Sequence, residues 1–320
     1  MSHKVSVIVP AYNAEKWIKA SIASILNQSW KNVEVIVIND GSTDNTASVI
    51  KEFDDARLFY YCQENKGQGA ASNFGLTKAT GDYIKFFDAD DLMNPVHIES
   101  QLKRLEGRSG CIASGAWGRF SGNDPGAAVF VPENVWRDLP GLEWLKTALS
   151  QPKDMMGACI WLIPRAIIEK SGGWDERLSL NNDFEFSCRL LLNAEMVLFA
   201  RDAKVYYRSD IGHSMTKKFT RKSVEAMLLS NDLGCSYLLK ADSSVGMRLL
   251  CANRFQDWVF QIYPDHGDIT RLMEKKVKEL GGSNIRPGGG KIFHLLKFFL
   301  GWKTVKRIQK FVRTHHFKEH

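Results

Sequence analysis

Three carboxylates stand within four positions at Asp88-Ala89-Asp90-Asp91, directly after the apolar run Tyr83–Phe87. Like charges this close repel one another, so the cluster requires a cation or hydrogen-bond donors beside it. If the extended geometry continued past the strand, Asp88 and Asp90 would point to the same side. Carboxylate oxygens suit Mg²⁺ or Mn²⁺, which take further ligands from water and substrate phosphate. The alternative is a solvated acidic helix start, where Asp caps free amides and meets the helix dipole favourably.

The chain before this cluster alternates between apolar runs and helical patterns. Strands are predicted at Val5–Val9, Asn32–Ile38, Leu58–Cys62 and Tyr83–Phe87, and helices at Glu15–Gln28, Asp44–Phe53 and Gln68–Lys78. Near-continuous apolar strands separated by helices favour an α/β fold with a mostly parallel sheet covered on both faces. The polar segments after the strands should therefore meet in one cleft at the carboxyl edge of the sheet.

Four polar motifs, in this order and spacing, resemble the family 2 glycosyltransferases, which have the GT-A nucleotide-sugar fold. The motifs cover about the first hundred residues and are Pro10-Ala11-Tyr12-Asn13, Asn39-Asp40-Gly41-Ser42-Thr43-Asp44, Asn65-Lys66-Gly67 with Ala70-Ala71-Ser72-Asn73-Phe74-Gly75, and Gly81-Asp82-Tyr83 leading into Asp88-Ala89-Asp90-Asp91. The resemblance implies a GT-A type, Rossmann-like, mostly parallel sheet flanked by helices and followed by a helical C-terminal region.

The resemblance also implies site residues for the sugar donor. Asp40 would accept a hydrogen bond from the base, and an aromatic ring such as Tyr12 suits the π face of that base. Asp88 would approach the ribose, and Asp90 would bind Mn²⁺ or Mg²⁺ with help from Asp88. The remaining donor-site residues are Pro10, Ala11, Asn13, Asn65, Lys66, Gly67 and Ala89. The alternatives are an Asx-turn at Asp40, a core position for Tyr12 and an ordinary polar loop at 65–67.

Transfer needs a base for the acceptor hydroxyl, and the resemblance places it at Asp183 in Asn182-Asp183-Phe184-Glu185-Phe186. Inverting members of the family commonly have Glu before this Asp, whereas this chain has Asn182. Removing a neighbouring negative charge should lower the pKa of Asp183 relative to a paired-acid version. The alternative role for Asp183 is to cap the helix that runs to Leu192, which is compatible with a catalytic role.

Three further positions are candidates for binding. A segment after the final sheet strand resembles a diphosphate-contacting or metal-contacting stretch of some family members, and it comprises Tyr206-Tyr207-Arg208 with Gly212-His213-Ser214-Met215-Thr216. His213 is therefore a candidate third metal ligand; a solvated histidine is the alternative. Trp161 and Trp174 could stack on an acceptor sugar beside Asn182, since a ring face suits pyranose C–H groups. The alternative for Trp161 is core packing.

Other nucleotide chemistries fit this chain poorly. The run Gly67-Gln68-Gly69 has Ser72 where a dinucleotide fingerprint needs a third glycine, and no phosphate-binding P-loop motif occurs. We therefore predict a metal-dependent inverting glycosyltransferase that moves a sugar from a nucleoside diphosphate, with UDP favoured, to a carbohydrate or lipid-linked acceptor in envelope, capsular or exopolysaccharide synthesis. The rivals are a non-catalytic nucleotide-sugar-binding scaffold and a sugar nucleotidyltransferase.

Composition favours a cytoplasmic location. The six cysteines show no paired or metal-type spacing, which suits a reducing compartment. A strand predicted from residue 5 leaves no room for a signal peptide, and no apolar run approaches the roughly 20 residues that span a bilayer.

Positive charge is concentrated in the last hundred residues. Residues 221–320 carry 18 Lys and Arg against 9 Asp and Glu, and residues 291–320 carry 8 against 1. We expect a catalytic domain at 1–218, a helical extension at 219–282, and a linker with one basic amphipathic helix at 283–320. The helix should bind an anionic membrane surface, with Phe293, Phe298 and Phe299 entering the acyl boundary, so that the chain is peripheral on the inner face. A helix docked on the catalytic domain is the alternative; no nucleic-acid partner is expected.

Overall fold

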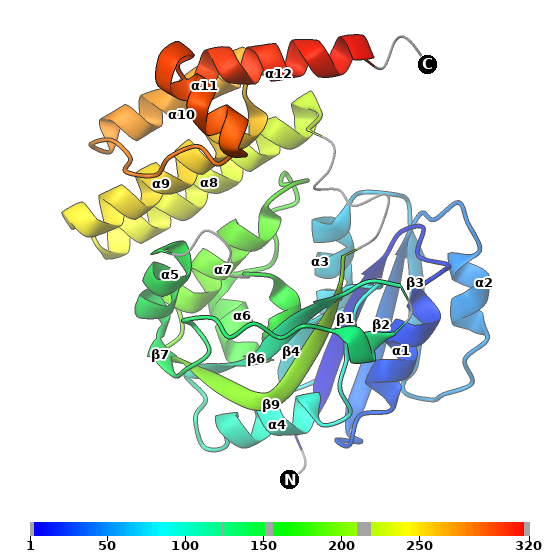
Figure 1. Cartoon of the computed structure of the whole chain (residues 1–320). Helices are drawn as coiled ribbons and strands as arrows, with labels where there is room; N and C mark the ends of the chain where they lie inside the picture. Colours follow the sequence, from blue (N-terminus) through cyan, green and yellow to red (C-terminus); the bar gives the residue numbers. More distant parts are fainter. Residues whose placement is uncertain (1–2, 123, 151–155, 210–218, 317–320) are drawn as a thin grey trace. The chain divides into compact units, whose positions relative to one another are not determined.

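The structure is a computed structural model that describes residues 3–122, 124–150, 156–209 and 219–316. The chain divides into two compact units, one ending at Lys217 and the other beginning at Lys218. Figure 1 shows the first unit in blue to green and the second in yellow to red. The further division of the second unit near residue 283 stays a proposal.

The first unit is built on a five-stranded sheet in the order β3-β2-β1-β4-β8. Four of the strands are parallel, and only β8 runs antiparallel, against β4. Their apolar and β-branched residues are almost all buried along β1, β2 and β4, which confirms the predicted α/β class. The strands are β1 (Val5–Ala11), β2 (Val33–Asp40), β3 (Leu58–Gln63), β4 (Tyr83–Phe86) and β8 (Ile163–Pro164).

Three helices connect the first four strands: α1 (Ile18–Leu26), α2 (Thr46–Lys51) and α3 (Gln68–Lys78). Helix α3 has the predicted bounds and buries mainly small residues against the sheet. A Cβ atom at Gly75 would lie 2.4 Å from Cγ2 of Ile8, so glycine permits the close approach of α3 to β1. Because α3 lies this close, its first residue is brought to the carboxyl edge of the sheet.

A second sheet in the order β5-β9-β6 was not predicted. Its strands are β5 (Leu92–Met93), β6 (Cys111–Phe120) and β9 (Met196–Arg208), and β7 (Leu139–Pro140) also pairs with β9. The apolar run at 158–163, whose composition is typical of a strand, is instead the 3₁₀ turn η2 (Ala158–Ile160) followed by the two-residue β8. Every residue from 158 to 163 is buried, and such a continuous run does not distinguish a strand from a buried turn.

The remaining elements of the first unit are α4 (His97–Leu105), the 3₁₀ turn η1 (Pro125–Ala127), α5 (Gly141–Ser150), α6 (Arg165–Ser171) and α7 (Asn182–Leu192). The second unit is helical, with α8 (Arg221–Ala241), α9 (Val245–Ile262), α10 (Gly267–Glu279), α11 (Lys291–Leu300) and α12 (Trp302–His316). The single basic helix predicted within 283–320 is interrupted at Gly301, whose φ of +73° belongs to the left-handed region that favours glycine. Among the described residues, no helix has both the length and the apolar character to cross a membrane.

Candidate active site

The carboxyl ends of β1 and β2 are tied together by their loops. The backbone N–H of Asn13 donates to Oγ of Ser42 at 3.0 Å, and the side-chain Oδ1 of Asn13 accepts from the backbone of Thr43 at 2.8 Å. Ala11 is buried, whereas Tyr12 is 53% exposed, so the alternative of a core position for Tyr12 does not hold. The structure therefore places an accessible aromatic ring at the edge of the sheet, as the donor-site prediction requires.

Asp40 is the last residue of β2 and organises the following loop. Its Oδ1 accepts from Nε2 of Gln63 at 2.7 Å and from the backbone of Lys66 at 2.9 Å, and its Oδ2 accepts from the backbone of Gly67 at 2.9 Å. The side chain is buried, with only 3% of the residue surface exposed. The structure thus brings Asp40, Lys66 and Gly67 together, while hydrogen bonding of Asp40 to a base stays a prediction.

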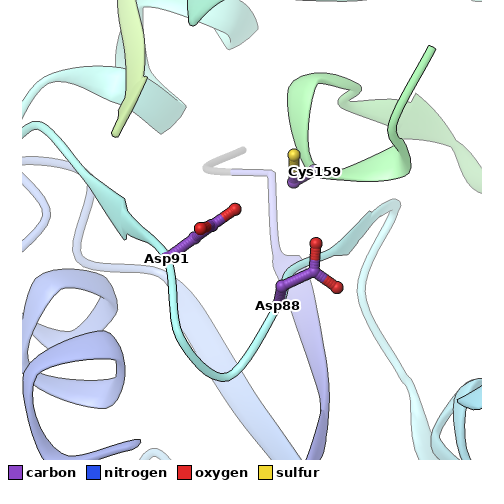
Figure 2. Close-up of side chains that lie close together, drawn as sticks. All are labelled: Asp88, Asp91 and Cys159. Carbon is purple, nitrogen blue, oxygen red and sulfur yellow. The ribbon is translucent and has the colours of Figure 1, made fainter. Parts of the chain in front are cut away.

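The acidic run after β4 forms a turn. The backbone N–H of Asp91 donates to the carbonyl of Asp88 at 3.3 Å, so the extended geometry that would align Asp88 with Asp90 ends at Phe86. The turn instead brings ligand atoms of Asp88, Asp91 and Cys159 within 4.8 Å of one another. Figure 2 shows the two carboxylates on this turn and the Cys159 side chain on the facing segment. Asp90 lies outside this group, and its role as a metal ligand stays a prediction.

Burial raises the pKa of all three carboxylates of the turn, and neighbouring negative charges raise those of Asp88 and Asp91 further. Burial, and then repulsion from Asp90 and Asp183, raises the pKa of Asp88, against a smaller lowering by the hydrogen bond from Gln68. Burial and the charges of Asp90 and Asp88 raise the pKa of Asp91 well above its ordinary value. Burial also raises the pKa of Asp90. Protonation relieves this repulsion, and so would a bound cation.

The donor set fits a hard divalent cation. Oδ2 of Asp91 is buried and has no hydrogen-bond partner among the described residues, so it offers a free ligand oxygen. Oδ1 of Asp91 accepts from the backbone of Arg208 at 2.9 Å, which holds the side chain in place. The third member, Cys159, is a soft ligand whose pKa is raised well above its ordinary value by burial, so its thiol stays protonated. The oxygens therefore suit Mg²⁺ or Mn²⁺ better than the sulfur does.

A buried arginine supplies positive charge to this acidic turn. Arg208 donates from Nε to the carbonyl of Asp90 at 3.0 Å, and its guanidinium lies over the rings of Trp17 and Phe120, at 4.2 and 4.4 Å from their centroids. Its charge lowers the pKa of Asp90 and Asp91, although burial outweighs this effect. Because the rings fix the guanidinium, it positions the turn and does not reach outward.

Asp183 lies in the first turn of α7, facing η2. Its Oδ1 accepts from the backbone N–H of Ala158 at 3.0 Å. Burial raises the pKa of Asp183 to about 6, against the lowering by this hydrogen bond. Removal of the neighbouring acid at Asn182 therefore does not give a low pKa, because burial dominates. The side chain of Asp183 makes no cap, since the N-cap is Asn181 and has no side-chain hydrogen bond.

Gln68 links the two acidic parts of the site. Its Nε2 donates to Oδ1 of Asp88 at 3.0 Å, and its Oε1 accepts from Nδ2 of Asn182 at 3.4 Å. Residues from the start of α3, the end of β4 and the start of α7 therefore form one network. On the other side of the acidic turn, the buried Lys85 donates to the carbonyls of Cys159 and Trp161 at 2.7 and 3.1 Å and so holds η2 in place.

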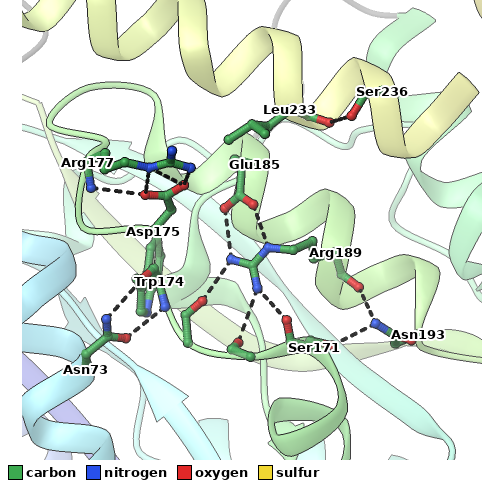
Figure 3. A network of polar contacts seen from close by, with 12 residues as sticks. Asn73, Ser171, Trp174, Asp175, Arg177, Glu185, Arg189, Asn193, Leu233 and Ser236 are labelled. Atoms are coloured by element: carbon green, nitrogen blue, oxygen red, sulfur yellow. Dashed lines mark hydrogen bonds and ion pairs between the residues drawn. The ribbon is translucent and has the colours of Figure 1, made fainter.

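A second polar network, shown in Figure 3, fixes the turn before α7. Asn73 of α3 exchanges two hydrogen bonds with the backbone of Trp174, at 2.8 and 2.9 Å. The side chain of Arg189 pairs with Glu185 and donates to the carbonyl of Gly173 at 2.8 Å. Helices α3 and α7 thus both bind the turn at Gly173-Trp174, which connects them and fixes the positions of Gln68 and Asp183 at their first turns.

The acceptor-site prediction is wrong for both tryptophans. Trp161 has no exposed surface and packs edge-on against Trp144, with 4.8 Å between ring centroids. Trp174 is 6% exposed and stacks on Phe186 at 4.1 Å. Neither ring has a free face for a sugar, because both are core residues. His213 lies outside the described residues.

Four contributors to this site were not singled out from the sequence: Gln68, Asp91, Cys159 and Arg208. Asp91 was visible in the acidic run, but its orientation depends on the turn that follows β4. Gln68 was visible as the first residue of a predicted helix at the sheet edge. Arg208 was visible only as part of the segment that resembles a diphosphate-contacting or metal-contacting stretch, and its contact with the acidic turn was not predicted. Cys159 comes from a distant segment and had no local signal.

The chain is similar in sequence to known glycosyltransferases. Residues 6–169 match the family described as glycosyl transferase family 2. A stretch of 120 residues is 40% identical to glycosyltransferase GlyA of Streptococcus pneumoniae, covering 37% of this chain and 17% of that protein. The chain is also 29% identical over 224 residues to the uncharacterized glycosyltransferase RT0329 of Rickettsia typhi, covering 69% of this chain and 68% of that protein. The chain thus spans less than a fifth of the pneumococcal relative.

Solved structures share the fold. The crystal structure of residues 1–349 of S. aureus TarS in complex with UDP-GlcNAc superposes with a TM-score of 0.67 at 21% identity, covering 87% of this chain and 83% of that chain. The corresponding complex with UDP gives a TM-score of 0.64 at 20% identity. At this level of identity the match establishes the GT-A fold alone.

Proposed function

The chain belongs to glycosyl transferase family 2, and from this membership we propose that it transfers a sugar from a nucleoside diphosphate to a hydroxyl of a carbohydrate or lipid-linked acceptor. UDP is the favoured nucleotide, because TarS, which shares the fold, was crystallised with UDP and with UDP-GlcNAc. Envelope, capsular or exopolysaccharide synthesis is the proposed setting.

One observation carries the proposal: a candidate base and a candidate cation site lie in a single network. Asp183 and Asn182 begin α7, and Asn182 reaches the Asp88 carboxylate through Gln68. Sugar transfer needs the diphosphate of the donor to be neutralised and the acceptor hydroxyl to be deprotonated at adjacent points. The start of α7 and the turn after β4 supply these two functions side by side.

Asp183 is the proposed general base. As the acceptor oxygen attacks the anomeric carbon, its proton passes to the Asp183 carboxylate, the bond from the anomeric carbon to the diphosphate oxygen breaks, and the configuration inverts. A pKa of about 6 leaves this carboxylate mostly ionised at neutral pH and still basic enough to take the proton. The backbone N–H of Ala158 holds the carboxylate in orientation.

The donor nucleotide is proposed to lie over the ends of β1 and β2. The exposed ring of Tyr12 offers a stacking face for the base. Asp40 fixes the loop at 65–67 through the backbone of Lys66 and Gly67, so that this loop can close one side of the nucleotide pocket.

Asp88, Asp90 and Asp91 are proposed to hold Mn²⁺ or Mg²⁺. When bound, such a cation neutralises the negative charge of the departing diphosphate, which is typically worth several kcal/mol. The protein contributes the orientation: Gln68 positions Asp88, and Arg208 positions Asp91. A free ligand oxygen on Asp91 supports the assignment.

The test is a transfer assay with the full chain, a panel of UDP-sugars, MnCl₂ and carbohydrate or lipid-linked acceptors. Asp183→Asn should lower turnover by about 10²–10⁴-fold, the usual contribution of a positioned base, while donor binding by thermal shift persists. The exposed Asp54→Asn is the matched control and should behave as the unmodified chain. An undiminished rate for Asp183→Asn would exclude the base assignment.

The same assay separates the rival functions. A scaffold would bind the donor without hydrolysis or transfer. A nucleotidyltransferase would consume a nucleoside triphosphate and a sugar phosphate. We propose in addition that the chain works at the inner face of the cell membrane through residues 291–320, supported by the excess of 8 Lys and Arg over 1 Asp or Glu in that segment.

A further inference from the structure

Helix α11 displays a stripe of apolar side chains to solvent. Ile292, Leu295, Leu296 and Phe299 are spaced at i, i+3, i+4 and i+7, so they share one face of the helix. They are 74, 63, 36 and 74% exposed, and the neighbouring Phe298 is 84% exposed. Exposed apolar surface on this scale is unfavourable in water and usually marks an interaction site.

The helix that follows is firmly docked within the second unit. The ring of Trp302 packs edge-on against Phe260 at a centroid distance of 5.0 Å, and Val305 is 1% exposed. Lys303 pairs with Glu274 at 2.6 Å. Helix α12 is therefore anchored on the unit, and through Gly301 it carries α11, in which Phe293 is buried.

Charge indicates what covers the stripe. Residues 291–316, which contain α11 and α12, have seven Lys and Arg and no Asp or Glu. Lys303 and Lys310 pair with Glu274 and Asp265 of the same unit, which leaves an excess of five positive charges (7 − 2 = 5). A second copy of this chain would bring the same positive charges against these, which is unfavourable. An anionic lipid surface combines negative headgroups with an apolar layer beneath them, so it complements both the charge and the stripe.

We propose that α11 inserts its apolar stripe into the interface of an anionic bilayer, with α12 as the anchor that holds it on the second unit. A helix of ten residues is about 15 Å long, half the thickness of the hydrocarbon core, so α11 lies in the interface. The prediction that Phe293 inserts is wrong, because it is buried in the protein; Phe298 and Phe299 remain. The inference deepens the proposed function by naming the surface at which a lipid-linked acceptor would be met.

The test is flotation of the full chain with vesicles of phosphatidylcholine alone or with about 30% phosphatidylglycerol. The chain should float with the anionic vesicles, less at high salt. Phe298→Asp/Phe299→Asp should lower the bound fraction by about tenfold or more, because two large apolar contacts are lost. Val245→Asp/Leu272→Asp, which places the same charges at exposed apolar positions of α9 and α10, is the matched control and should float normally.

Equal flotation of the Phe298/Phe299 variant and the control would overturn the inference, as would the absence of binding to anionic vesicles. Light scattering after size exclusion tests whether a second copy of the chain covers the stripe instead. If the unmodified chain is a dimer, does not bind vesicles and becomes a monomer in the Phe298/Phe299 variant, the stripe is a dimer contact. Donor binding by thermal shift in the same samples is independent of vesicle binding, so failure of the membrane inference and failure of the proposed function give different results.

Discussion

Strands β2 and β4 end in carboxylates at the same edge of one sheet, yet the two ends are built differently. At the end of β2, Asp40 accepts three hydrogen bonds from the protein. At the end of β4, three carboxylates lie together and share few donors, and Oδ2 of Asp91 has no partner among the described residues. A carboxylate whose oxygens are satisfied organises a loop, whereas a repelling, under-satisfied cluster is stabilised by protonation or by a bound cation. The hydrogen bonds that each acid accepts therefore distinguish the two strand ends better than residue type does.

Removal of the β4 acids should give the largest effect. Asp88→Asn/Asp91→Asn should reduce Mn²⁺-dependent transfer by about 10²–10⁴-fold, since cation stabilisation of a leaving group is worth several kcal/mol. The metal-free variant should unfold at a higher temperature than the unmodified chain, because the mutual repulsion of buried charges is relieved. Initial rates and thermal unfolding, each with and without MnCl₂, check both expectations.

If the β4 acids bind a cation, the double substitution should lower the transfer rate and raise the unfolding temperature without metal. Added MnCl₂ should stabilise the unmodified chain by mass action and leave the variant unchanged. If Asp88→Asn/Asp91→Asn is less stable than the unmodified chain when both are measured without metal, the β4 acids stabilise the fold, as Asp40 does.

Asp40→Asn should lower stability, in contrast to removal of the β4 acids, and its effect should be smaller. An amide cannot accept at both positions, so the backbone N–H of Lys66 or Gly67 loses its acceptor in a buried place. The free energy of unfolding should fall by about 1–3 kcal/mol, the usual cost of an unsatisfied buried donor. Urea denaturation measures it, with the exposed Asp54→Asn as control. A loss no larger than that of the control would remove the structural role of Asp40.

The fold around these acids was predictable where local pattern decides it. The alternation from β1 to α3 follows from apolar runs and helical spacing, and the convergence of strand ends follows from their parallel order. The second sheet was not predictable in this way, because β6 contains Gly115, Gly118 and Ser114 and has a register shift after Gly115. Its pairing with β9 is decided by contacts about 85 residues apart in the chain.

The site was predictable in location and less so in detail. The acidic run identified the correct strand end, but the choice between Asp90 and Asp91 depends on a turn whose geometry the strand pattern does not fix. Cys159, Lys85 and Arg208 enter through long-range packing, for which a single sequence has no signal. The acceptor-site prediction for Trp161 and Trp174 was wrong for the same reason, since the exposure of a side chain depends on tertiary packing.

The pH dependence tests whether Asp183 belongs with the functional acids. With a pKa of about 6, the transfer rate at saturating donor should be level above pH 7 and fall about tenfold by pH 5, because a protonated carboxyl cannot accept the acceptor proton. Single-turnover rates measure this directly. A rate that is flat down to pH 5 would exclude Asp183 as the titrating base.

The pH dependence of the free energy of unfolding tests Asp183 independently of the transfer rate. The folded-state pKa of Asp183 lies above its ordinary value of 3.8, so the folded state binds the proton more tightly than the unfolded state. The contribution of Asp183 to stability is therefore present at low pH and is lost as pH rises from about 4 through 6. In EDTA, Asp183→Asn should remove this part of the slope of unfolding free energy against pH.

Cys159→Ser should give the smallest effect on the proposed cation. The thiol lies among the candidate ligands, but a protonated sulfur contributes little to a hard ion that prefers oxygen. The affinity for Mn²⁺, measured by calorimetry, should change by no more than about threefold, while the affinity for the soft ion Cd²⁺ should fall by about tenfold or more. Cys62→Ser, at an exposed position, is the control for both ions. A large loss of Mn²⁺ affinity in Cys159→Ser would show that the sulfur is a ligand. The difference between the ends of β2 and β4 would then involve this thiol as well as the carboxylates.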